Sequence, residues 1–307
     1  MITNKIPITE QTKGIIIKLL NNENHRPLIQ TYIDAKFLDY VIEFFKKIVN
    51  AKLENESITS EWYKKEFLNE NLDKEEIAYN AGLNLKTITN TYNSATKEIV
   101  LSASLKHYSE LYTTIDKLIK YGGDINISLT IKFKEVSVEL DINESLIIIN
   151  SLAVRRAGFR GGAWSQIGKN VEKPLMIVLC ELFSVPKEFY SLVGLKSLRE
   201  VDFYLIDNNK HEHRCEIKLM GKGNPESADV IHARKTEVFV ADALSEMNKK
   251  QFDENSIQWI ELRENEGYKK FDKILEYYKI PHEKNSMDLN DKLKRIFNEI
   301  FIVKNKS

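Results

Sequence analysis

Several features that mark other classes of protein are scarce in this chain of 307 residues. It has two cysteines, Cys180 and Cys215, which are too few for a disulfide framework or for a zinc site, and we expect both to be reduced and buried. No apolar run approaches the ~18 residues that span a membrane. The N-terminal stretch MITNKIPITEQTKG lacks the apolar core of a secretion signal. These absences exclude a disulfide-rich secreted scaffold and a membrane protein, and we expect a soluble, cytoplasmic chain.

The composition is that of a globular protein, with 42% hydrophobic and 29% charged residues. A chain of this length can bury one large core or two modest ones. We expect two parts, a mainly helical region over residues 1–145 and a mixed α/β region over residues 146–307.

The most informative segment of the second part is a predicted β-hairpin. Arg199–Asp207 and His211–Met220 alternate in polarity and are rich in β-branched or aromatic residues, which indicates two strands. The loop between them, residues 208–210, has two asparagines, which tolerate the left-handed conformation that a three-residue loop needs. With the loop centred on position 209, Asp202 lies directly opposite Glu216.

Strand side chains alternate between faces, so one face of this hairpin is apolar and the other carries Asp202, Glu216 and Lys218. Opposed carboxylates destabilise a sheet unless something positive lies between them, and Mg²⁺, which binds oxygen ligands, is the expected occupant. The alternative is a solvated face without function, because the pattern D…ExK is common by chance.

The predicted elements around the hairpin add to this pattern. Ser165–Phe183 has helical apolar spacing after a possible serine N-cap, which predicts a helix before the hairpin. Downstream, Lys235–Ala241 is typical of a strand, Asp242–Lys250 of a short helix and Ile257–Leu262 of another strand. The expected order is αβββαβ.

This order, with an acid in the first hairpin strand and ExK in the second, resembles the core of the PD-(D/E)xK nuclease superfamily, over about residues 150–265. Within it, the chain resembles a type II restriction endonuclease of restriction-modification systems, and the stretches GFRGGAWSQIGKNVEKP and GKGNPESAD resemble the CfrBI-like group. The name-giving proline is replaced by Val201. The resemblance implies Mg²⁺-dependent cleavage of double-stranded DNA to 5′-phosphate ends at a short, palindromic site, by a homodimer.

Carried to this chain, the resemblance makes Asp202 and Glu216 metal ligands, with the backbone carbonyl of Ile217 as a third. It places Lys218 beside the attacking water and Glu172 near the metal. We expect Lys218 to stay protonated next to two carboxylates and to act electrostatically.

Glu172 has an equal alternative as an ordinary surface residue. Pro174 follows two positions later, so either a helix opens at Pro174 or a longer helix bends there. Glu200 points to the same face as Asp202 but lies farther from the loop, which argues against it as the ligand.

Two polar segments are candidates for contact with DNA. The first is basic and glycine-rich, and we interpret it as a loop that contacts the DNA backbone or, alternatively, as a basic turn without a ligand. Its basic residues are Arg155, Arg156, Arg160, Lys169 and Lys173. The second follows the ExK strand and either reaches base edges or is a solvated loop. Its candidates are Lys222, Asn224, His232 and Arg234.

The helical region contains amphipathic runs over Ile33–Val49 and Leu105–Ile119. Between them, Ala78, Gly82 and Ile88 have the spacing of a helix-turn-helix, which would expose Lys86, Thr87, Thr89 and Asn90 at the start of a recognition helix. An ordinary helical hairpin is the alternative. Alternation over Ile127–Ile142 predicts a short β-ribbon, followed by a helix near Glu144.

The formal net charge is zero, with 45 basic and 45 acidic residues. Phosphate contacts by lysine and arginine supply much of the affinity for DNA, so local clusters must do so here. Neutrality favours the alternative of a non-catalytic helix-turn-helix DNA-binding protein. A further alternative is a repair or mobile-element nuclease of the same fold.

Overall fold

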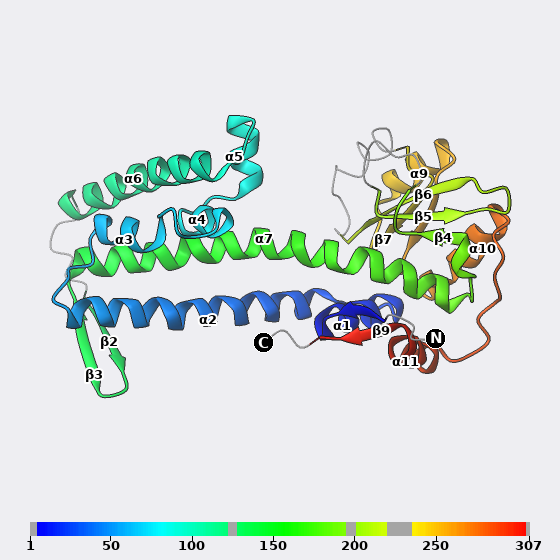
Figure 1. The fold of residues 1–307 in the computed structure, drawn as a ribbon, viewed down its shortest axis with the longest axis horizontal. Helices are drawn as coiled ribbons and strands as arrows, with labels where there is room; N and C mark the ends of the chain where they lie inside the picture. The colour runs from blue at the N-terminus through cyan, green and yellow to red at the C-terminus, as the bar shows by residue number, and fades with distance from the viewer. Residues whose placement is uncertain (1–4, 122–127, 195–200, 220–234, 305–307) are drawn as a thin grey trace. The chain divides into compact units, whose positions relative to one another are not determined.

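The computed structural model describes residues 5–121, 128–194, 201–219 and 235–304, and it mixes α-helices with small β-sheets (Figure 1). Within these ranges, no helix is both long and apolar enough to cross a membrane. The α-helices are α1 (Glu10–Leu20), α2 (Arg26–Leu53), α3 (Ser60–Phe67), α4 (Lys74–Asn80), α5 (Leu85–Tyr92), α6 (Lys97–Tyr121), α7 (Ile142–Leu182), α9 (Glu246–Glu254), α10 (Lys270–Tyr277) and α11 (Leu289–Ile300). The strands are β1 (Ile6–Ile8), β2 (Leu129–Phe133), β3 (Val136–Leu140), β4 (Tyr190–Ser191), β5 (Phe203–Ile206), β6 (Glu212–Lys218), β7 (Val238–Ala241), β8 (Gln258–Glu261) and β9 (Phe301–Val303).

The chain divides into two compact units that differ from the parts expected from the sequence. One unit combines Met1–Ile29 with Gln166–Ser307, and the other is Gln30–Ser165. The N-terminal segment joins the C-terminal unit because β1 pairs in parallel with β9. The expected boundary between residues 145 and 146 falls inside helix α7, which contributes residues to both units.

Helix α7 begins 23 residues before Ser165, the expected start, because a capping box sets its first turn. The amide of Glu144 donates to Oδ1 of Asp141 at 2.9 Å, and the amide of Asp141 donates to Oε2 of Glu144 at 3.1 Å. The prediction of a helix near Glu144 is confirmed, whereas the prediction of a serine N-cap at Ser165 is wrong. Pro174 lies inside α7, so the longer helix is the correct one of the two alternatives.

The unit formed by residues 30–165 is mainly helical and has one aromatic-rich core. The expected β-ribbon is confirmed as the antiparallel pair β2 and β3. Glycines of the basic segment serve helix packing here, because a Cβ at Gly158 would lie 3.1 Å from the ring of Tyr79 and one at Gly162 would overlap the Tyr79 hydroxyl. The basic segment lies within helix α7, so its interpretation as an open loop is wrong.

Helices α4 and α5 are joined by a short turn. Gly82 in the turn has φ +76° and closely approaches Val154, while Ala78 and Ile88 are buried. Asn84 caps α5 by accepting a hydrogen bond from the amide of Thr87 at 2.9 Å. The spacing of these residues thus predicted two short helices joined by a glycine turn, an arrangement that fits a helix-turn-helix and an ordinary helical hairpin alike.

The other unit contains a five-stranded sheet in the order β4-β5-β6-β7-β8 (Figure 1). Strands β5 and β6 form the expected antiparallel hairpin, and β6, β7 and β8 run parallel. Helix α9 packs against the sheet, with the ring of Phe252 4.8 Å from that of Phe239 on β7. Strand β4 is an additional edge strand that the sequence did not indicate.

The hairpin loop closes as a three-residue loop, but its left-handed residue is Lys210 (φ 64°) and not an asparagine. The amide of Lys210 donates to the carbonyl of Asp207, and the carboxylate of Asp207 accepts from the amides of Asn209 and His211. The loop needs its left-handed residue at the last position, where the chain re-enters the ladder. The place of a residue in the loop therefore decides which one is left-handed, and it outweighs the general tolerance of asparagine for that conformation.

The apolar side of the hairpin lies in the core of this unit. Cys215 and Ile217 on β6 are fully buried, as is the segment of α7 from Leu175 to Leu182 apart from Glu181. Cys180 and Cys215 are free and buried, as predicted. Burial raises the pKa of both thiols, which keeps them neutral and unreactive.

Candidate active site

Asp202, Glu216 and Lys218 meet at the hairpin in the register that the sequence indicated. Phe203 pairs with Cys215, so the preceding residue Asp202 lies across from Glu216. The ammonium Nζ of Lys218 is 3.5 Å from Oδ2 of Asp202 and 3.4 Å from Oε2 of Glu216. The side chain of Glu216 is fully buried, so this polar face is covered and is not a solvated surface.

Helix α7 adds a third carboxylate to this group. Oε1 of Glu172 lies 3.8 Å from Nζ of Lys218, and the side chain of Glu172 is only 13% exposed. The alternative of an ordinary surface glutamate is therefore wrong. Glu172, Asp202, Glu216 and Lys218, which we call the acidic centre, come from three separate segments of the same unit.

The protein holds Asp202 in place through the main chain of the neighbouring strand. The amide of Ile217 donates to Oδ2 of Asp202 at 3.0 Å, which fixes the carboxylate beside β6. Asp202 stands immediately before β5, at the point where the chain enters the sheet. Its carboxylate is thus held by the backbone of β6, next to the first ladder pair of β5.

Charge is unbalanced in the acidic centre, where three carboxyl groups surround one ammonium. Burial, followed by the negative charge of Asp202, raises the pKa of Glu172 to about 7, against the opposing effect of Lys218. A dication would relieve this repulsion, and a set of oxygen donors suits a hard cation such as Mg²⁺. The residues present therefore fit a divalent metal.

The raised pKa of Glu172 predicts a pH dependence of stability in metal-free protein. The folded state keeps a proton on Glu172 between pH 4.5 and about 7 that the unfolded state releases. The free energy of unfolding should therefore fall as the pH rises through this range. Thermal unfolding should be measured in the presence of a chelator from pH 4.5 to about 7. The free energy of unfolding should fall less over this range for Glu172→Gln than for the unchanged protein.

The exposed Glu188 provides a matched control, because Glu188→Gln removes a carboxyl group outside the acidic centre. This variant should keep the pH dependence of the unchanged protein. An identical pH dependence in Glu172→Gln would contradict the assignment.

The basic residues of α7 differ in exposure. Arg155 is buried, donates to Oδ1 of Asn80 at 2.7 Å and stacks on Tyr40 and Phe159. The expected contact of Arg155 with the DNA backbone does not agree with this placement, because its guanidinium binds and stacks on residues of its own unit. The others, Arg156, Arg160, Lys169 and Lys173, are exposed.

Exposed polar residues also begin helix α5. Lys86, Thr87 and Asn90 are exposed there, as the helix-turn-helix spacing predicted. The remaining candidates, Lys222, Asn224, His232 and Arg234, and also Glu200, lie outside the described residues.

Sequence reasoning missed two groups of possible metal ligands. One consists of His211, His213 and Glu237, and the other of Asp272, Glu276 and His282. The spacing His-x-His on a predicted strand was a usable signal for the first group, since alternate residues share a face. The carboxylate of Glu237 could be added only once the pairing of β6 with β7 was known.

Comparison with known proteins gives one result. No curated protein and no solved structure matches the chain. A family model described as CfrBI restriction endonuclease matches residues 9–249, which is most of the chain. On this match, together with the acidic centre of its hairpin, the chain belongs to the CfrBI restriction endonuclease family.

Proposed function

We propose that this protein is a type II restriction endonuclease that hydrolyses double-stranded DNA at a specific sequence with Mg²⁺ bound in the acidic centre. Membership of the family indicates sequence-specific DNA cleavage, and restriction endonucleases typically use a divalent metal. To this we add that the metal is Mg²⁺, that the residues of the acidic centre bind it, and that cleavage occurs at one specific DNA sequence. The observation that carries it is the meeting of Glu172, Asp202 and Glu216 around Nζ of Lys218.

We further propose that the sheet is a PD-(D/E)xK core. One support is the antiparallel β5–β6 hairpin, which carries the acid and the ExK pattern. The other is that β7 and β8 extend the sheet in parallel with β6, with α9 between them in the chain. Val201 stands where the name-giving proline would be. Proline there is not needed for the register, which the hydrogen-bonded ladder already sets.

Asp202, Glu216 and the carbonyl of Ile217 would hold the ion, and Glu172 would lie beside it. When bound, such an ion lowers the pKa of a water molecule and neutralises charge on the phosphoryl oxygens. The protein's own groups position the reactants. Lys218, held between the carboxylates, keeps its proton and orients the attacking water by donating hydrogen bonds.

The exposed basic residues of α7 and the exposed start of α5 are proposed to contact DNA. Arg156, Arg160, Lys169 and Lys173 would bind phosphates, while Lys86, Thr87 and Asn90 would lie near base edges. A homodimer would bring one acidic centre to each strand of a palindromic site. The cytoplasm, where a matching DNA methyltransferase would protect the host sequence, is the proposed location.

Incubation of purified protein with plasmid DNA tests the proposal. With Mg²⁺, the plasmid should yield discrete fragments whose sequenced ends share one short motif and carry 5′-phosphates. A chelator should abolish this cleavage and added Mg²⁺ should restore it. Fragments with unrelated ends would favour a repair or mobile-element nuclease, and intact plasmid despite tight binding would favour a non-catalytic helix-turn-helix protein.

A further inference from the structure

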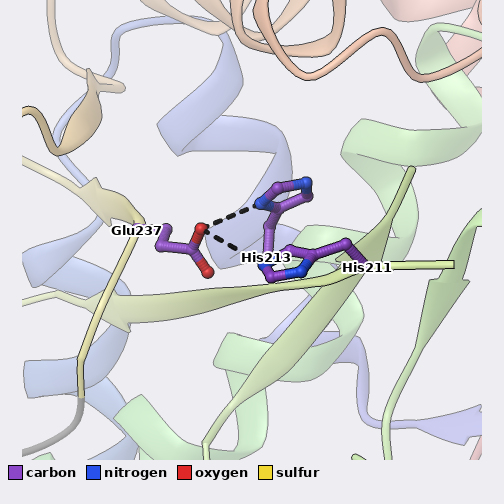
Figure 2. A group of neighbouring side chains, drawn as sticks. All are labelled: His211, His213 and Glu237. Atoms are coloured by element: carbon purple, nitrogen blue, oxygen red, sulfur yellow. Dashed lines mark hydrogen bonds and ion pairs between the residues drawn. The ribbon is translucent and has the colours of Figure 1, made fainter. Parts of the chain in front are cut away.

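A second cluster of side chains that could hold a metal ion lies at the other end of β6, and its two histidines alternate in face with Glu216 and Lys218. His211 and His213 are two residues apart at the start of β6, and Glu237 immediately precedes β7 (Figure 2). Residues 211 and 213 share the face of Cys215 and Ile217, whereas Glu216 and Lys218 occupy the other face. The cluster is thus distinct from the acidic centre.

One carboxylate oxygen of Glu237 lies within reach of both imidazoles. Oε1 is 2.9 Å from Nδ1 of His213 and 4.0 Å from Nε2 of His211, and dashed lines in Figure 2 mark both contacts. One ligand atom from each of the three residues falls within 4.8 Å of the others. Donors bound to zinc at about 2.0–2.1 Å in a tetrahedron stand roughly 3.3 Å apart, so small side-chain rotations suffice.

His213 has a carboxylate on each side of its ring, as a metal-binding histidine commonly does. Its ring is nearly buried, at 7% exposure, and Nε2 has no hydrogen-bond partner among the described residues. Oδ2 of Asp207 lies 3.8 Å from Nε2, on the side of the ring away from Nδ1. A ligating histidine commonly donates its other N–H to a carboxylate, which orients the ring.

Other contacts between described residues hold the cluster in place. The ring of Tyr278 packs on His213, with ring centroids 3.9 Å apart, and its hydroxyl donates to the carbonyl of Glu237. The second oxygen of Glu237 accepts a hydrogen bond from the amide of Arg214 at 3.2 Å. One carboxylate oxygen is therefore anchored, and Oε1 is directed at the histidines.

We propose that His211, His213 and Glu237 bind a transition-metal dication of the Zn²⁺ class. Two imidazoles and one carboxylate are a zinc ligand set that leaves a position for water, and the borderline-soft nitrogen donors select against Mg²⁺. The expectation that two cysteines are too few for a zinc site applies to thiolate sites and does not extend to this set of imidazole and carboxylate ligands. The ion would join the hairpin to the start of β7, and this role is independent of DNA cleavage.

The group Asp272, Glu276 and His282 is a weaker competitor. Nε2 of His282 is 3.1 Å from Oδ1 of Asp272 and Nδ1 is 2.7 Å from the carbonyl of Ile280, and this group has one imidazole where the other has two. Lys284 lies 3.5 Å from Asp272 and 3.3 Å from Glu276, which places a positive charge on the acids. This group serves as an internal control.

The test uses the full chain after a chelator has removed bound metal. Zn²⁺ is titrated into this protein in the presence of a chromophoric chelator that competes for the ion, and excess Mg²⁺ is added to occupy the acidic centre. One equivalent of Zn²⁺ should bind tightly and raise the temperature of unfolding of the protein. Co²⁺ bound in place of Zn²⁺ should absorb visible light. His211→Gln and His213→Gln should each weaken the affinity at least ~10-fold. His211 is 64% exposed, so its variant should fold even if His213→Gln does not.

His282→Gln and Asp202→Asn are the matched controls, and both should bind Zn²⁺ as the unchanged protein does. Absence of tight Zn²⁺ binding would overturn the proposal, as would unchanged affinity in His211→Gln. Loss of binding in His282→Gln alone would assign the ion to the other group and would equally overturn it. None of these measurements depends on whether the protein cleaves DNA.

Discussion

Replacement of Lys218 by alanine is expected to reduce DNA cleavage by ~10³-fold while leaving specific DNA binding almost unchanged. Nζ of Lys218 lies within 3.8 Å of three carboxylates, where it can orient a water molecule and offset developing negative charge. Loss of one such preorganised donor in a covered site costs roughly 10²–10³ in rate, and loss of the charge that separates the carboxylates adds to this. Single-turnover cleavage with Mg²⁺ measures the effect.

Lys250→Ala is a matched control, because Lys250 is 79% exposed and pairs with Glu254 on the surface of α9. This variant should cleave at the normal rate. Binding should be compared on DNA that holds the mapped cleavage site, with Ca²⁺ in place of Mg²⁺. Normal turnover by Lys218→Ala would remove Lys218 from the mechanism, and lost binding would show a structural role instead.

Replacement of Arg155 by alanine is expected to lower the free energy of unfolding by about 2–4 kcal/mol, since it removes a buried charge network and its packing. The guanidinium donates to Oδ1 of Asn80 and to the carbonyl of Glu76, and stacks 4.5 Å from the ring of Tyr40. Without it, the buried Oδ1 of Asn80 loses its charged donor. Urea unfolding followed by circular dichroism measures the change.

The neighbouring Arg156 is the control, because it is 55% exposed and its pair with Asp34 is a surface interaction. Arg156→Ala should change the free energy of unfolding by less than ~1 kcal/mol. Equal stability of the two variants would contradict the structural role of Arg155. Weaker DNA binding in Arg156→Ala, with stability retained, would support a phosphate contact at that position.

The hairpin could be predicted from sequence because its information is local. Alternation assigns each residue of β5 and β6 to a face, and a loop of fixed length sets which residues oppose each other. Asp202 and Glu216 therefore stand opposite one another as predicted. The left-handed residue was misassigned because asparagine preference is a weaker determinant than position in the loop.

Helix α7 shows where local reasoning failed. The glycines at 158 and 162 indicated an open loop, yet both lie within one helix, and the longer of the two helices considered at Pro174 is the one that forms. The glycines are retained because Tyr79 packs on them, a contact between residues about 80 positions apart. Such a contact has no trace in the local pattern, so a packing site was interpreted as an open loop.

By itself, the amino-acid sequence determined the strands of the hairpin, the face on which its charges lie and the resemblance to a restriction endonuclease family, because these depend on short-range periodicity and spacing. Tertiary structure alone decided that Glu172 belongs to the acidic centre, that Arg155 is internal and that Glu237 meets two histidines. In each of these cases the partners are at least 24 residues apart in the chain, and only the packing of separate elements brings them within a few ångströms.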